Sequence, residues 1–139
     1  MTGATLRDGA RITLLAAVVV AGVGSLLPFA TSGERSRSSY ELVSLARRLE
    51  VVPEGWPGAA TRLWFAVPLV LVACWLLVLI GQTPAAAWCA LAAAAVLTAG
   101  LVAVWRSPLD VSTGWTVTSS GTVGIVASAA VLLATARRP

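Results

Sequence analysis

Hydrophobic residues fill three long uncharged stretches of the chain, and polar residues gather in short segments between them. No charged residue occurs at positions 12–30, 63–105 or 111–136. A helix needs about 20 apolar residues to cross the hydrocarbon layer of a membrane, so the middle stretch is long enough for two crossings. The sequence Gly-Gln-Thr-Pro at 81–84 supplies a turn that divides it. The pattern therefore predicts four transmembrane helices, at 12–30, 63–80, 85–105 and 115–136.

The predicted fold is an all-α membrane protein, a four-helix transmembrane bundle made by one domain over residues 1–139. The spans are expected to be helices because lipid offers the backbone no hydrogen-bond partners. Four spans place both termini on one side of the membrane. Arg7 and Arg11 precede the first span, which favours cytoplasmic termini under the positive-inside rule. The loop side carries more arginines, six against four, but these are interleaved with acidic residues.

The connection between the first two spans, residues 31–62, has the pattern of a short amphipathic helix. Ser38 and Glu41 have capping-box spacing, in which each side chain satisfies a backbone N–H of the other residue, and Pro53 ends the helix. Polar and charged residues at Glu41, Ser44, Arg47 and Arg48 occupy one face. The opposite face is apolar, and its residues are Leu42, Leu45, Ala46, Leu49 and Val52. Such a helix is expected to lie in the plane of the membrane interface.

Composition agrees with a membrane protein and argues against nucleic-acid binding. Of the 139 residues, 58% are hydrophobic and 12% are charged, whereas a soluble domain carries about 25% charged residues. All ten basic residues are arginines, and the formal net charge is +4. These arginines lie at span ends and are not clustered with stacking aromatics, so anionic lipid is the expected partner.

No residue pattern indicates catalysis, a cofactor or a metal. The predicted spans contain no ionisable side chain of the kind that proton- or ion-coupled carriers need. The chain has no histidine, no CxxC pair, no GxSxG element and no phosphate-binding loop. Cys74 and Cys89 both fall inside predicted spans, where they act as small hydrophobic residues. We therefore predict a protein that is not an enzyme, with no catalytic, cofactor-binding or metal-binding residue.

Three groups of residues are candidates for contact with lipid or a partner protein. Arg35 and Arg37 follow the first span, and their guanidinium groups suit lipid headgroups or a partner's carboxylate as well as simple anchoring. The loop helix offers Tyr40, Leu42, Leu45 and Leu49. Small residues recur at four-residue steps in Ser120, Gly124 and Ser128, and in Ala17, Ala21 and Ser25. Such rows allow helices to approach closely, either within one chain or between two proteins.

One segment resembles a known group of proteins. Pro28-Phe29, Ser32-Gly33 and the run Arg37 to Leu42 occur in the order found in small four-span membrane proteins of actinobacteria, and the similarity covers about 17 residues and the topology. Proteins of this group mostly have no assigned activity. The resemblance implies a bacterial cell membrane and an ordered, functional loop.

Two functions remain open on this basis. The first is a non-enzymatic accessory or scaffold subunit of a larger envelope complex, for example one that transports lipids or cell-wall precursors, docked onto another integral membrane protein. The second is a stand-alone protein that binds or carries a lipid or a small hydrophobic molecule. In that case the region of Arg35 and Arg37 and the hydroxyl-rich start of the fourth span would face the ligand.

Overall fold

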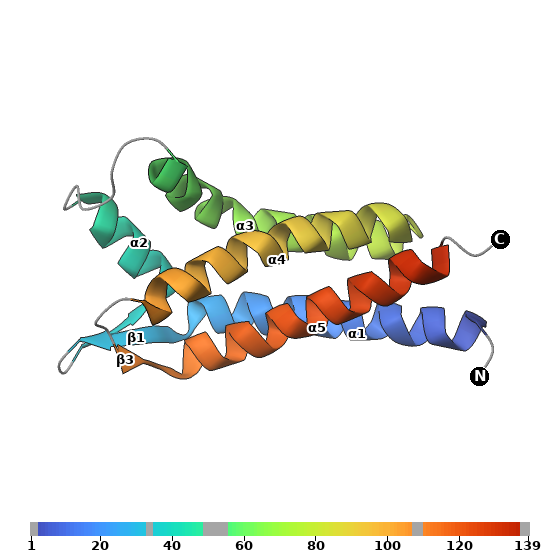
Figure 1. The fold of residues 1–139 in the computed structure, drawn as a ribbon, viewed down its shortest axis with the longest axis horizontal. Coiled ribbons are helices and arrows are strands. Elements are labelled where there is room, and N and C mark those ends of the chain that lie inside the picture. Colours follow the sequence, from blue (N-terminus) through green and yellow to red (C-terminus); the bar gives the residue numbers. More distant parts are fainter. Residues whose placement is uncertain (1–2, 33–34, 49–55, 107–109, 137–139) are drawn as a thin grey trace.

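The computed structural model describes residues 3–32, 35–48, 56–106 and 110–136, and most of them are helical (Figure 1). Four of its helices are long and apolar enough to cross a membrane. The fifth helix is short, and three short strands lie beside it at the end of the molecule away from the start of the chain. In chain order the elements are α1 (Gly3–Leu26), β1 (Pro28–Ser32), β2 (Arg35–Ser38), α2 (Ser39–Arg48), α3 (Trp56–Leu79), α4 (Thr83–Trp105), β3 (Asp110–Val111) and α5 (Thr113–Ala136).

The prediction of four long apolar helices is confirmed, but each helix begins earlier than predicted. The first helix starts at Gly3 and not at residue 12, and the second at Trp56 and not at residue 63. For these two helices the reason is that an arginine ends the uncharged stretch but does not end the helix, since arginine is a good helix former. Arg7 and Arg11 therefore belong to the first turns of α1.

The described residues are mainly helical, as expected, but three short strands add a small sheet, and the expectation that the first helix continues to residue 30 is wrong. Helix α1 ends at Leu26, and β1 takes over from Pro28. The three strands form an antiparallel sheet in the order β2-β1-β3. Ala30 is paired with Arg37 on one side and with Val111 on the other, so the sheet joins the first connection to the third. Proline at residue 28 favours this change, because its ring disfavours helical backbone at the residue before it.

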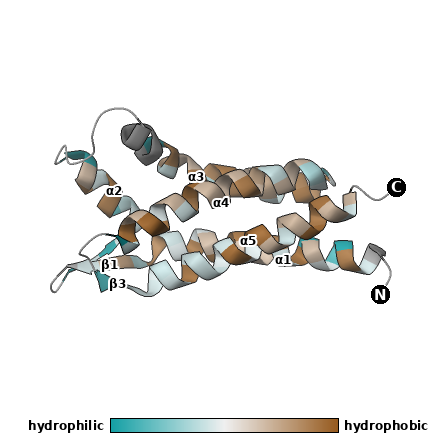
Figure 2. Cartoon of the chain, in the orientation of Figure 1, coloured by the Kyte–Doolittle hydropathy of each residue, from teal (hydrophilic) through white to brown (hydrophobic). Residues whose placement is uncertain are grey.

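The four long helices pack side by side, and consecutive ones run in opposite directions (Figure 1). Helix α1 packs against α5 and α3, and α4 packs against α3 and α5, so α1 and α4 lie diagonally opposite. Hydrophilic residues gather around the strands and α2 and, at the other end, on the first turns of α1 (Figure 2). Between these two ends the long helices expose mainly apolar side chains, as a lipid-facing surface requires, although α5 also exposes Thr116 and Ser120.

The closest helix contact is between α1 and α5 and is made by small residues. A Cβ atom placed on Gly121 would lie 2.5 Å from the backbone nitrogen of Ala21, and one on Gly124 would lie 2.9 Å from the Cβ of Ala17. Near the strands, a Cβ on Gly24 would lie 2.6 Å from the nitrogen of Thr118. In lipid, helices associate through such close van der Waals contact.

Candidate functional site

A surface depression of about 560 Å³ lies between β2 and α2. It is an open groove, and both of its walls carry polar side chains. Strand β2 supplies one wall and the outward face of α2 supplies the other. Its lining residues are Arg35, Ser36, Arg37, Glu41, Ser44, Leu45 and Arg48.

A capping box sets the angle between the two walls of this groove. The backbone N–H of Ser38 donates to Glu41 Oε2 at 3.0 Å, and the N–H of Glu41 lies 3.4 Å from Ser38 Oγ. The predicted capping box is therefore confirmed. It ends the strand and begins α2 within two residues, so Arg37 and Glu41 remain close enough to line one groove.

Replacement of Ser38 by alanine should loosen α2 by about 1 kcal/mol, because the first turn loses its side-chain acceptor. Hydrogen exchange of the amides at 39–48 should become faster, while exchange in the long helices stays the same. Ser44→Ala is the matched control, since Ser44 lies in the interior of α2 and its hydroxyl donates to the helix carbonyl of Glu41. Equal exchange rates in both variants would contradict a capping role for Ser38.

Helix α2 is anchored to the long helices by buried polar contacts. Ser39 is buried, and its hydroxyl donates to the carbonyl oxygen of Ser25 at 2.6 Å. The indole N–H of Trp64 donates to Ser39 Oγ at 3.3 Å, and the hydroxyls of Tyr40 and Ser25 are 3.3 Å apart. The face of α2 that touches the core therefore includes Tyr40 and Val43. Leu42 and Leu45, which belong to the apolar face predicted from the sequence, are half-buried.

The groove is strongly basic. It carries three guanidinium groups and one carboxylate, and that carboxylate already accepts the Ser38 N–H. Within the described ranges, none of the groove arginines forms an ion pair. The ion pair found in those ranges joins Arg11 to Asp8, both on α1. Arg35 and Arg48 are exposed and Arg37 is half-buried, so a ligand in the groove can reach these side chains. Such forked donors match the oxygens of a phosphate or carboxylate group.

The structure brings together some of the predicted contact residues and separates others. Arg35, Arg37 and Leu45 line the groove, whereas Tyr40 packs inward against Phe65, with ring centroids 5.9 Å apart. Leu42 does not line the groove, and Leu49 lies outside the described residues.

The row Ser120, Gly124 and Ser128 does not form one surface. Ser128 is buried, Gly124 is half-buried against α1, and Ser120 is exposed. Each four-residue step turns by about 40° around a helix, so such a row drifts from one face to another. The buried contact on α5 instead follows alternating steps of four and three, through Gly114, Thr118, Gly121, Ile125 and Ser128. The row Ala17, Ala21 and Ser25 is buried throughout and serves internal packing.

Sequence reasoning missed Ser36, Ser44 and Arg48 as members of the site. The spacing of Glu41, Ser44, Leu45 and Arg48 places them on one face of a helix, and this spacing could have found them. The hydrophobic pattern divides α2 only into an apolar face and a polar face, whereas the face that lines the groove carries residues of both kinds. Its partner wall, β2, could not be seen because the strand was not predicted.

The arrangement can bind an anion, and its residues do not suggest bond-making chemistry. Among the described residues, no group of three or more His, Cys, Asp or Glu side chains could hold a metal ion. Cys74 and Cys89 are free thiols on α3 and α4, away from the groove. The groove itself contains hydroxyls, guanidinium groups and one carboxylate engaged in capping.

Comparison of the chain with protein-family models, with curated proteins and with solved structures finds no match. A function therefore has to be inferred from the geometry and charge of the groove.

Proposed function

We propose that this chain is a non-enzymatic, four-helix transmembrane bundle that binds the phosphate-bearing headgroup of an anionic lipid in the groove between β2 and α2. The observation that carries the proposal is the convergence of Arg35, Arg37 and Arg48 on one groove of about 560 Å³ with a single carboxylate. A site of this size holds a ligand as large as a glycerophosphate headgroup. The arginines would bind the phosphate oxygens, and Ser36 and Ser44 would contact the polar remainder.

The position of the groove supports a lipid as the ligand. It lies at the end of the molecule where α1 gives way to the strands, the same end at which α3 begins and α4 ends (Figure 1). This is the depth at which a membrane presents its headgroups to a protein. Leu45 adds an apolar side chain to the lining, which suits the first methylene groups of a lipid.

We further propose a bacterial cell membrane as the location, with cytoplasmic termini and the groove on the outer surface. The support is the pair Arg7 and Arg11 at the start of the first span, since basic residues there favour the cytoplasmic side. On this orientation the groove would meet lipids of the outer leaflet.

Neutralising the groove should remove lipid selectivity. In the variant Arg35→Gln, Arg37→Gln, Arg48→Gln, binding of phosphatidylglycerol measured by native mass spectrometry in a neutral detergent should weaken at least about tenfold. The reason is that a hydrogen bond to a charged group contributes about 1.5–3 kcal/mol, and 1.4 kcal/mol corresponds to a factor of ten. Binding of zwitterionic phosphatidylcholine should change little.

The matched control is Arg62→Gln, Arg106→Gln, which removes exposed positive charge at the same end of the molecule without altering the groove. It should keep most of the phosphatidylglycerol affinity. If the control and the groove variant lose affinity equally, general surface charge explains the binding and the groove is not a site.

A second function, an accessory subunit of an envelope complex, is supported by one observation. Helix α5 exposes a row of residues at alternating three- and four-residue steps, of which the first three carry hydroxyls: Thr113, Thr116, Ser120, Val123 and Ala127. The hydroxyls of Thr116 and Ser120 donate to carbonyls of their own helix at 2.8 Å, so lipid could face them without unsatisfied polar groups. We therefore rank this function below headgroup binding.

A further inference from the structure

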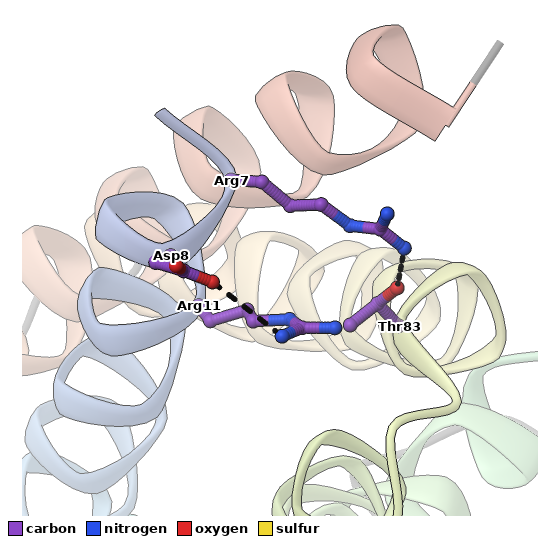
Figure 3. Close-up of polar contacts among 4 residues, drawn as sticks. All are labelled: Arg7, Asp8, Arg11 and Thr83. Carbon is purple, nitrogen blue, oxygen red and sulfur yellow. Dashed lines mark hydrogen bonds and ion pairs between the residues drawn. The ribbon is translucent and has the colours of Figure 1, made fainter. Parts of the chain in front are cut away.

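A second group of arginines lies at the opposite end of the molecule and is not part of the groove. Arg7 and Arg11 extend from α1 toward the first turn of α4, the helix diagonally across from it (Figure 3). Arg7 Nη2 donates to the hydroxyl oxygen of Thr83 at 3.0 Å. Thr83 is buried, so the guanidinium group of Arg7 contacts a residue of the packed interior.

Positive charge accumulates here with little to balance it. The two arginines are four positions apart on one helix, an arrangement in which like charges repel. They occupy the first turns of α1 and point toward the first turn of α4, and both helix starts carry positive partial charge. Neither helix has an acidic residue in its first turn, and no side chain caps α4. The nearby carboxylate, that of Asp8, is exposed and lies 3.5 Å from Arg11.

The arginines also have hydrogen-bonding capacity that the protein does not use. The Nε atom of Arg11 is buried and has no partner among the described residues. A buried donor without an acceptor is rare in folded proteins and calls for a water or an ion. The partner that Arg7 has, Thr83, is neutral and cannot offset its charge. An oxyanion placed between the two guanidinium groups would offset the charge of both.

We infer that Arg7, Arg11 and the first turn of α4 form a binding site for one phosphate group, distinct from the groove and at the other membrane surface. The phosphate belongs either to a lipid headgroup or to free inorganic phosphate, and both use the same chemistry of forked donors. The site does not depend on the proposed function, because no residue is shared with the groove. With a lipid in it, the protein would hold anionic lipid in both leaflets.

The test is the thermal stability of the full chain in a neutral detergent, for the wild type and for Arg7→Gln, Arg11→Gln. Without added anion, the double variant should be at least as stable as the wild type, because repulsion and an unsatisfied donor have been removed. Because the groove is intact in both proteins, phosphatidylglycerol should then raise the Tm of the wild type by about 5 °C more than that of the variant. The control Arg62→Gln, Arg106→Gln should respond as the wild type does.

Other ligands and a second variant separate the alternatives. Stabilisation of the wild type over the glutamine variant by inorganic phosphate, beyond that by chloride at matched ionic strength, with an equal lipid shift in both, would support the site and identify its ligand as free phosphate. The variant Arg7→Lys, Arg11→Lys keeps the charge but not the forked donors, and should lose part of the shift. The inference is overturned if neither phosphate source distinguishes the wild type from the glutamine variant. The inference is also overturned if the glutamine variant is less stable than the wild type without any anion. The arginines would then only stabilise the fold through the hydrogen bond to Thr83.

Discussion

Replacement of Gly121 by alanine is expected to destabilise the folded protein by about 1–3 kcal/mol, the usual effect of inserting a methyl group where there is no room for it. The new Cβ would lie 2.5 Å from the nitrogen and 2.8 Å from the Cα of Ala21. These are backbone atoms of a packed helix, so α1 and α5 must separate to make room. Because lipid provides no hydrophobic force to hold them together, the lost close contact is not recovered elsewhere.

The control for this prediction is Gly9→Ala on α1. A Cβ at Gly9 would have no atom within 4 Å, so alanine should raise the stability by up to about 1 kcal/mol through its better helix propensity. The measurement is unfolding in increasing dodecyl sulfate, followed by circular dichroism. Opposite signs for the two variants support the α1–α5 contact as the main packing interface, and equal effects would contradict it.

Replacement of Trp64 by alanine should have the second large effect, a loss on the order of 3 kcal/mol. The indole is 5% exposed and makes three kinds of contact. Its ring packs onto Gly100 of α4, meets Phe29 edge-on with ring centroids 6.3 Å apart, and its N–H donates to Ser39 Oγ. The substitution leaves a cavity where α3, α4, β1 and α2 meet. It also frees α2, so phosphatidylglycerol binding in the groove should weaken as well.

Trp105→Ala is the matched control, since this tryptophan is 68% exposed. Its loss should change the unfolding free energy little, because a lipid-facing ring has no packed partners to lose. Both variants can be followed in the same dodecyl sulfate titration, together with native mass spectrometry of bound lipid. A stable Trp64→Ala protein that retains full lipid binding would show that α2 is not held through this residue.

The four long helices could be predicted because uncharged runs of this length have one plausible environment. The capping box was also predictable, since it depends on two residues three positions apart, Ser38 and Glu41. Local patterns of this kind do not need knowledge of distant segments.

The sheet and the groove could not be predicted, for a physical reason. Strand β3 has two residues, too few for an alternating pattern, and it pairs with β1 across most of the chain: Thr31 with Asp110. Short strands of this kind form because the ends of α1 and α5 bring them together. Because β1 and β2 are not predicted from the sequence, the groove wall that contains Arg35 and Arg37 is not predicted either. Arg48 is then interpreted as an ordinary surface residue of a helix.

The pairing of Arg7 with Thr83 was hidden for a related reason. Both residues stand at helix starts that the charge pattern placed outside or at the edge of the spans. Only the diagonal arrangement of α1 and α4 brings them within 3.0 Å. Sequence patterns identify the faces of single helices, but the order in which helices pack decides which ends meet.

The most direct test of headgroup binding is gentle purification of the tagged protein from its own membranes, with mass spectrometry of its lipids and proteins. We expect one phosphate-bearing anionic lipid at one or more copies per chain, enriched over the bulk membrane and reduced in Arg35→Gln, Arg37→Gln, Arg48→Gln. A lipid content equal to that of the bulk membrane, together with a protein partner in fixed stoichiometry, would contradict headgroup binding and favour the accessory-subunit function.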